Sequence, residues 1–338
     1  MINAGIIGLG KMGLSHCAIL NVHPEVNLVG VCDTSKFNRF ILNKYSKLEC
    51  FDNHEKMLKD KQLDCLFIAT PTRFHADMAT QALEFGLHLF VEKPFCLDPT
   101  DSVRLTKLAA DKGVVTQVGY HNRFVGSFCE AKRLLDEGII GEVHHFLAEA
   151  YGPVVLKEKG GTWRSSATEG GGCLYDYASH VVNLTEFMVG PADKASGSVL
   201  QSIFSKGVDD AVYSTLTYKD GKSGQISVNW SDETYRKMTT QVTLYGKAGK
   251  LFVDQSEVRI YLQKYNEKHN LEKGWNTRYI TDVTKSVDFF LRGEEYSAQV
   301  DNFVQAIKEG RTDNINSFAS AATTDAMVAQ IRSNSQEK

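Results

Sequence analysis

The chain has 338 residues, a length at which a single hydrophobic core usually gives way to two, so two domains are expected. A charged fraction of 23% is ordinary, and a net charge of -3 argues against a general nucleic-acid surface. No apolar run reaches the length of a membrane span, and no basic region precedes the first one. Seven scattered cysteines without CxxC spacing fit a reducing compartment, so a cytoplasmic protein is expected.

The first residues are typical of a strand, a glycine-rich turn and a helix. Residues 4–7 are apolar, Gly8, Gly10 and Gly13 match the pattern GxGxxG, and residues 12–20 look helical. In such a turn, glycines permit a tight bend, close approach of the backbone to a pyrophosphate, and close packing of helix on strand. The N–H groups at the helix start favour phosphate. The pattern predicts a dinucleotide site.

A second apolar strand, residues 26–32, ends at Asp33, twenty residues beyond Gly13. A carboxylate at that position accepts hydrogen bonds from a ribose 2′-OH and repels a 2′-phosphate, which favours NAD. Lys36 and Arg39 lie close enough to serve a phosphate, so NADP stays an alternative. Asp33 would also suit a turn or a helix cap.

Further strands at residues 63–69, 87–91 and 114–118 alternate with helices at 75–85 and 100–111. Repeating βα units predict a parallel, doubly wound Rossmann sheet with right-handed crossovers. One strand runs directly into Glu92, Lys93 and Pro94. Charges at the carboxyl end of a buried strand lie where open α/β sheets bind ligands, although a solvated charge pair would also explain them.

The pattern changes in the second half of the chain. After a helix at residues 127–137, β-rich runs follow without helices between them, at residues 143–151, 196–204, 211–218, 225–230, 240–244 and 258–263. Such a series predicts an α+β domain on a large, mostly antiparallel open sheet, with a hairpin turn at Asp220-Gly221. Domains at 1–124 and 125–338 are expected, and amphipathic helices at 297–308 and 317–331 are candidates to pack back on the first.

Three consecutive glycines, residues 170–172, precede a predicted helix that carries Asp176 and His180. Residues four apart share one helical face. A histidine can accept a proton from an alcohol near neutral pH, and a carboxylate beside it can orient it or contact substrate. A capping aspartate and a half-buried histidine would give the same pattern. Neither HxxxH nor HExxH spacing occurs on this helix, so no metal site is predicted.

Taken together, the glycine turn from Gly8 to Gly13, the Glu92-Lys93-Pro94 turn, and the glycine run followed by Asp176 and His180 resemble the Gfo/Idh/MocA oxidoreductases. That family includes glucose–fructose oxidoreductase and inositol dehydrogenases. The resemblance covers nearly the whole chain. It implies a Rossmann domain followed by an antiparallel sheet domain whose open face makes homodimers or homotetramers.

The resemblance also implies roles for individual residues. Those implied for cofactor binding are Gly8, Gly10, Lys11 and Met12 at the pyrophosphate, Asp33 at the adenosine ribose, Thr70, Pro71 and His75 near the nicotinamide, and Glu92 and Lys93 at the nicotinamide ribose. Lys93 would bind the substrate hydroxyl, with His180 as the general base and Asp176 orienting it or binding a neighbouring hydroxyl. Which of Lys93 and His180 finally accepts the proton stays open.

The predicted reaction is a reversible hydride transfer between the nicotinamide and a secondary alcohol of a sugar, cyclitol or nucleotide-sugar. The candidate substrate contacts are Tyr120, Asn122, Arg123, Trp163, Arg164 and Tyr235. Trp163 and Arg164 could offer an aromatic face and a bidentate donor, although Trp163 would equally suit core packing. Two alternatives are a redox-neutral NAD-dependent glycoside hydrolase and a non-catalytic dinucleotide sensor. No nucleic-acid or membrane partner is expected.

Overall fold

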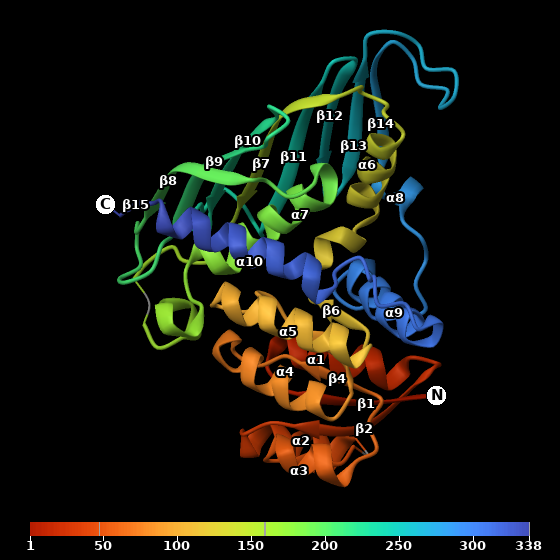
Figure 1. Ribbon diagram of the computed structural model, residues 1–338, viewed down its shortest axis with the longest axis vertical. Helices are drawn as coiled ribbons and strands as arrows, with labels where there is room; N and C mark the ends of the chain where they lie inside the picture. The colour runs from red at the N-terminus through yellow and green to blue at the C-terminus, as the bar shows by residue number, and fades with distance from the viewer. Residues whose placement is uncertain (47, 159, 338) are drawn as a thin grey trace. The chain divides into compact units, whose positions relative to one another are not determined.

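The computed structural model describes residues 1–46, 48–158 and 160–337, and the chain forms two compact units (Figure 1). The first unit contains residues 1–121 and 286–322, and the second contains residues 122–285 and 323–338. The chain therefore returns to its first unit after the second sheet is complete. Helix α10 (Phe318–Ser333) begins in the first unit and ends in the second.

The first unit is built on a six-stranded parallel sheet with the strand order β3-β2-β1-β4-β5-β6. Its strands are β1 (Ile2–Ile7), β2 (Val26–Cys32), β3 (Cys50–Phe51), β4 (Cys65–Ile68), β5 (His88–Val91) and β6 (Thr116–Val118). Because the order reverses beside β1, this is the doubly wound Rossmann arrangement, which confirms the predicted fold class of this part.

Helices cover both faces of this sheet. They are α1 (Lys11–Val22), α2 (Lys36–Tyr45), α3 (His54–Asp60), α4 (His75–Glu84), α5 (Pro99–Lys112) and, from the returning segment, α9 (Glu294–Glu309). Alternate residues of β1 enter different cores. Ile6 packs in one core with Ile19 of α1 and Phe303 of α9, whereas Ile7 belongs to the opposite core with Leu83 of α4 and Leu105 of α5.

The second unit contains a nine-stranded sheet in the order β14-β13-β12-β11-β7-β10-β9-β8-β15. Its strands are β7 (Val143–Tyr151), β8 (Lys194–Gln201), β9 (Ala211–Thr217), β10 (Ser223–Asn229), β11 (Thr239–Gly246), β12 (Gly249–Asp254), β13 (Glu257–Leu262), β14 (Gly274–Tyr279) and β15 (Gln336–Glu337). The predicted mostly antiparallel sheet is confirmed, with parallel pairing only for β7 with β10 and β15 with β8 among the described strands. Strands β9 and β10 form the expected hairpin.

Helices α6 (Gly126–Asp136) and α7 (Ser179–Val189) pack against strands of this sheet, and the short α8 (Ile280–Val283) packs on α6 (Figure 1). Phe146, Ala148 and Ala150 of β7 are fully buried, whereas the residues between them are only half-buried. Successive side chains of a strand point to opposite faces, so this alternation identifies one covered and one more open face.

Helix α2 and strands β12 and β14 were not predicted from the sequence, nor were the short elements β3, α8 and β15. Helix α2 does carry apolar residues at helical spacing, at Phe37, Phe40 and Ile41, but none of its residues is buried in the structure. Strand β14 has no fully buried side chain. The predicted helix after the glycine run also starts differently, because Leu174–Ala178 forms a π-helical turn before α7. None of the helices in the described ranges is long and apolar enough to cross a membrane.

Candidate functional site

The glycine turn leaves the start of α1 open. Gly8 adopts φ +91°, and a Cβ there would lie 2.5 Å from the Ala69 carbonyl oxygen. A Cβ on Gly13 would collide with the Gly8 carbonyl, whereas a Cβ on Gly10 would meet open space. No side chain caps α1 and no acidic residue lies in its first turn. The first N–H groups of this helix can therefore receive an anion such as a pyrophosphate.

Asp33 lies beside this turn at the end of β2. Its carboxylate accepts hydrogen bonds from the Leu9 N–H at 2.5 Å and the Ser35 N–H at 2.7 Å. Arg39 donates to the Asp33 carbonyl oxygen at 2.5 Å. The contact with Ser35 is the turn-forming contact that the sequence predicted as one alternative. The contact with Leu9 joins the loop after β2 to the glycine turn after β1. The Arg39 guanidinium serves the backbone here.

Glu92 is a buried anion at the end of β5. Its Oε1 lies 2.7 Å from Nε2 of the buried His16, and its Oε2 accepts the Lys93 N–H at 3.2 Å. A Cβ on Gly119 would approach this carboxylate to 2.8 Å. Burial raises the pKa of Glu92, but the hydrogen bond and charge of His16 and the charge of Lys93 outweigh burial and lower it. These contacts fix the backbone from which Lys93 projects.

His75 is completely buried and joins two loops of the same sheet edge. Its Nε2 lies 3.0 Å from the Thr70 carbonyl oxygen, and its Nδ1 lies 3.1 Å from the carbonyl oxygens of both Pro94 and Phe95. Burial lowers the pKa of His75, and the three carbonyl groups act in the opposite direction. The structure therefore places this imidazole as a brace for the cis Lys93-Pro94 turn. Pro71 is exposed next to it.

Sequence reasoning missed two residues near Lys93. The His121 ring stacks on the Tyr296 ring of α9, with centroids 5.0 Å apart and an interplanar angle of 19°. Burial and the nearby charges of Lys93 and Arg292 lower the pKa of His121 to about 4, against the charge of Glu92. Burial raises the pKa of Tyr296 to about 12. These shifts favour a neutral imidazole close to Lys93 and a neutral phenol on the ring stacked against that imidazole.

His121 lies between the predicted substrate contacts Tyr120 and Asn122, so its position after β6 could have identified it as a site residue. Tyr296 is 175 residues away in the sequence (296 − 121) and gave no local signal. The neighbouring Tyr120 is buried, and its carbonyl oxygen accepts the side-chain amide of Asn316 at 2.7 Å.

In the second unit, the structure brings Trp163, Arg164 and Asp176 together. Arg164 donates from Nε to Oδ2 of Asp176 at 2.9 Å, and its guanidinium lies 4.5 Å from the Trp163 ring centroid. Asp176 is 6% exposed and His180 is 4% exposed, so both are held by packing. Arg164 retains a half-exposed side chain, so it can pair with Asp176 and still reach a ligand.

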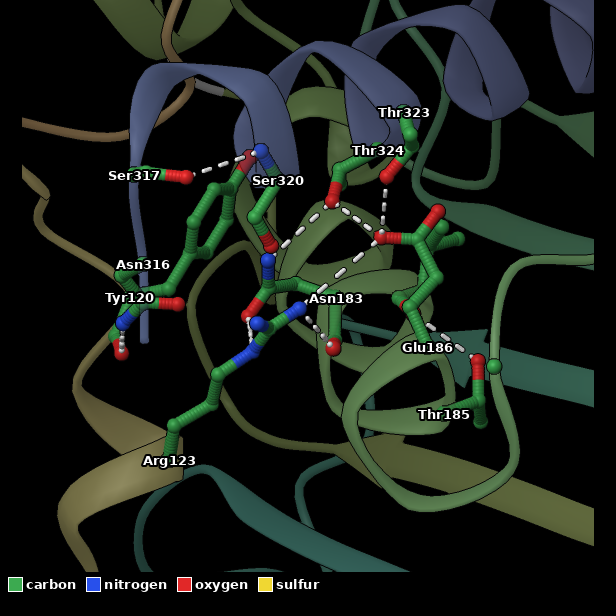
Figure 2. A network of polar contacts seen from close by, with 12 residues as sticks. Tyr120, Arg123, Asn183, Thr185, Glu186, Asn316, Ser317, Ser320, Thr323 and Thr324 are labelled. Carbon is green, nitrogen blue, oxygen red and sulfur yellow. Dashed lines mark hydrogen bonds and ion pairs between the residues drawn. The ribbon is translucent and has the colours of Figure 1, made fainter. Parts of the chain in front are cut away.

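Arg123, a predicted substrate contact, is almost fully buried in the second unit. It is buried in a polar network with α7, where it donates to the side-chain and main-chain oxygens of Asn183 at 2.8 and 2.9 Å (Figure 2). Its Nη2 lies 4.0 Å from Oε2 of Glu186, which accepts the hydroxyl groups of Thr323 and Thr324. We assign Arg123 to bracing α7, because both edges of its guanidinium face protein groups.

Asn122 is also buried, at 2% exposed. Tyr235 stacks on Tyr151 with centroids 5.6 Å apart, and Tyr151 bonds the Ser227 hydroxyl at 2.6 Å. Tyr151 belongs to the half-buried residues of β7, so Tyr235 lies on the more open face of the sheet. Lys11 is exposed and Met12 is half-buried, both in the first turn of α1.

Within the described ranges, no group of three His, Cys, Asp or Glu side chains is arranged to hold a metal ion. All seven cysteines are free thiols.

Comparison with known families identifies both halves of the chain. Residues 2–120 match the family model for an oxidoreductase family with an NAD-binding Rossmann fold, and residues 128–252 match the GFO/IDH/MocA C-terminal domain. The chain belongs to the GFO/IDH/MocA oxidoreductase family. The resemblance drawn from the glycine turn, the Glu92-Lys93-Pro94 turn and the Asp176–His180 pair is thereby confirmed, and with it NAD as the cofactor of the Rossmann unit.

The three relatives described next share 20 to 24% of their aligned residues with the chain. Scyllo-inositol 2-dehydrogenase (NAD(+)) of Bacillus subtilis (strain 168) is 22% identical over 98% of this chain and 94% of its own length. 2,7-anhydro-N-acetylneuraminate hydratase of Escherichia coli (strain K12) is 24% identical over 76% of this chain and 68% of its own. The structure of levoglucosan dehydrogenase with NADH and levoglucosan superposes with a TM-score of 0.87 at 20% identity, covering 98% of this chain and 96% of that one.

Proposed function

We propose that the protein is an NAD-dependent dehydrogenase that transfers a hydride between the nicotinamide and a secondary alcohol of a sugar, cyclitol or nucleotide-sugar. The observation that carries this proposal is that the chain has three side chains suited to this chemistry. An ammonium lies on a braced turn at the sheet edge, at Lys93, and a buried carboxylate and imidazole lie on one helical segment, at Asp176 and His180. Curated relatives act on inositols and on glucosides.

The first unit fits the dinucleotide. The uncapped start of α1, the open space at Gly10 and the position of Asp33 together provide a pyrophosphate site and a ribose acceptor. The preference for NAD over NADP follows from the Asp33 carboxylate, since a 2′-phosphate would bring a second negative charge to it. When bound, NAD supplies the hydride acceptor.

In the proposed chemistry, one residue accepts the hydroxyl proton and another stabilises the negative charge on the substrate oxygen. His180 takes the hydroxyl proton as the general base, and Asp176 orients the substrate or the imidazole. The Lys93 ammonium stabilises the oxygen as negative charge develops, and this stabilisation is already organised because Glu92 and His75 hold its turn. Reduction of a ketone uses the same groups in reverse.

The test is a screen of sugars, cyclitols and nucleotide-sugars with NAD, followed by the absorbance of NADH. We expect one class to produce NADH, and Lys93→Ala to reduce kcat by about 100- to 1000-fold while the Kd for NAD changes less than about threefold. Normal turnover by Lys93→Ala would contradict the mechanism. Lys11→Ala is the matched control: this exposed lysine would change the affinity for NAD without this loss of kcat.

A redox-neutral reaction is the second candidate, and the likeness to a hydratase of an anhydro sugar favours it. An NAD-dependent glycoside hydrolase would belong to the same class, because oxidation and re-reduction cancel within one turnover. Substrate consumption followed by NMR, without accumulation of NADH, would identify this class. Binding of NAD without turnover of any candidate would instead favour the sensor.

A further inference from the structure

The helical segment that carries Asp176 and His180 begins against a loop from elsewhere in the same unit. The Cys173 N–H donates to the Asp209 carbonyl oxygen at 2.8 Å, and the Leu174 N–H donates to Asp209 Oδ2 at 2.6 Å. One residue thus satisfies two of the N–H groups that a helix start leaves without partners. The capping residue lies 35 residues away from Leu174 in the sequence.

The glycine before this segment makes room for the contact. Gly172 has φ +107°, and a Cβ at this position would lie 2.6 Å from Asp209 Oδ1. The Gly172 carbonyl oxygen in turn accepts the Asp176 N–H at 3.1 Å. The backbone between the capping carboxylate and Asp176 is therefore fixed at both ends.

The loop that presents Asp209 is anchored by the next residue. Asp210 is fully buried, and its Oδ2 accepts the N–H groups of Ile203, Phe204 and Ser205 at 2.6 to 2.8 Å. Its Oδ1 accepts the Trp230 indole N–H at 2.6 Å. Burial raises the pKa of Asp210, but these hydrogen bonds outweigh burial and lower it, which favours the charged carboxylate.

Two charged groups act on Asp209: Arg332 of α10 and the neighbouring Asp210. Burial raises the pKa of Asp209 to about 6; the Leu174 N–H and Arg332 act to lower it, and the charge of Asp210 adds to the rise. Arg332 is itself bound to the Tyr175 hydroxyl at 3.0 Å, which joins α10 to the same helical segment. Asp209 and Arg332 both line a cavity of about 340 Å³, so water can reach the carboxylate.

We propose that Asp209 is a positioning residue for the reaction: its carboxylate and carbonyl fix the start of the segment 173–189 and thereby set the places of Asp176 and His180. The inference rests on the proposed function, since it assigns Asp209 a role in that site. A segment that starts with a π-helical turn has an irregular hydrogen-bond pattern, so an external anchor decides where its side chains point. Asp209 touches neither substrate nor cofactor in this role.

The test compares Asp209→Ala, Asp209→Asn and the matched control Asp193→Ala. Asp193 also accepts a backbone N–H, that of Lys219 at 2.8 Å, in the same unit but away from the segment. We expect Asp209→Ala to fold, because water can replace the carboxylate, and to lose about 10- to 100-fold in kcat with the Kd for NAD unchanged. Asp209→Asn keeps an acceptor oxygen and should stay within about threefold of wild type. Asp193→Ala should match wild type.

A simple loss of stability would lower the folded fraction, and with it the number of NAD-binding sites, so unchanged NAD stoichiometry together with rescue by asparagine distinguishes positioning from that effect. Equal kcat in wild type and Asp209→Ala would overturn the proposal, and so would equal losses in the alanine and asparagine variants. If wild type oxidises no candidate, the proposed function fails on its own. Amide hydrogen exchange then decides the anchoring: faster exchange at residues 173–178 in Asp209→Ala alone supports it, and unchanged exchange rejects it.

Discussion

The chain contains two glycine runs that lead into helices, and they end in opposite ways. At Gly8–Gly13 the helix start has no cap and Gly10 faces open space. After Gly170–Gly172, by contrast, Asp209 accepts the N–H groups at the start of the helical segment, and its carboxylate occupies the space where a side chain of residue 172 would lie. The comparison teaches that glycine before a helix has two uses. One leaves the positive helix end available for an anion, and the other admits a protein carboxylate that closes it.

The largest effect should come from adding a side chain to the second glycine run, at Gly172. Gly172→Ala would hold alanine at φ +107° with its Cβ against Asp209, so we expect the free energy of unfolding to fall by about 3 kcal/mol. Urea unfolding measures the change. The control is Gly197→Ala in the same unit, at φ +60° with nothing near the Cβ, which should cost about 1 kcal/mol. Equal losses would show that the carboxylate contact is unimportant.

The next largest effect should come from adding a capping carboxylate to the uncapped N-terminus of α1. Gly10→Asp places an N-cap carboxylate on α1 in open space, so the protein should gain up to about 1 kcal/mol of stability. The Kd for NAD should rise about 100-fold, because the carboxylate competes with the pyrophosphate for the same N–H groups. Gly10→Ala, measured by the same calorimetric titration, is the control for bulk. Undiminished affinity of the aspartate variant would place the pyrophosphate elsewhere.

Glu186, near the C-terminal end of α7, offers a test by pH dependence. Burial raises the pKa of Glu186 from 4.5 to about 7, against its hydrogen bonds from Thr324 and Thr323 and the charge of Arg123. A raised pKa means that the folded protein binds the proton more tightly, so stability is full below pH 4.5 and falls as the pH rises through about 7. Glu186→Gln should remove about 2 kcal/mol of this fall, measured by urea unfolding between pH 5 and pH 8. A wild-type slope in the variant would contradict the raised pKa.

The smallest effect concerns the cap itself. Burial raises the pKa of Asp209 from 3.8 to about 6, although the Leu174 N–H and Arg332 lower it. Stability should therefore decline as the pH rises through about 6, and Asp209→Asn should lessen this decline by about 1 kcal/mol after allowance for water in the adjoining cavity. The asparagine variant would then be more stable than wild type at pH 8. The reverse order would show that the charged carboxylate stabilises the fold.

Much of the first unit could be predicted from local sequence. Strand β4 and residues 89–91 of β5 are continuous apolar runs, and β5 leads directly into Glu92, Lys93 and Pro94. The turn at Glu92-Lys93-Pro94 and the pair Asp176 and His180 were found in the same way. Helix α2 was not predicted although Phe37, Phe40 and Ile41 have helical spacing, so its signal was present in the sequence and was overlooked. Strand β14 lies at the edge of its sheet and has no fully buried side chain.

The roles of side chains were harder to predict than the elements. Arg123 follows a strand end, where a substrate contact is expected, yet its guanidinium is bound by Asn183 and paired with Glu186. His121 was passed over, although its ring is stacked on Tyr296. In both cases the deciding partner lies 60 or more residues away, and a sequence pattern carries no information about such pairs.

The sequence by itself determined the two kinds of sheet, the family, the glycine turns and the positions of Lys93, Asp176 and His180, because each depends on neighbouring residues or on a short period. The tertiary structure alone decided where the returning segment begins and ends, at residues 286–322, that Glu92 is held by His16, and that Asp209 closes the second glycine run. Those facts depend on contacts between distant segments, which form only when the apolar faces of the elements are buried together.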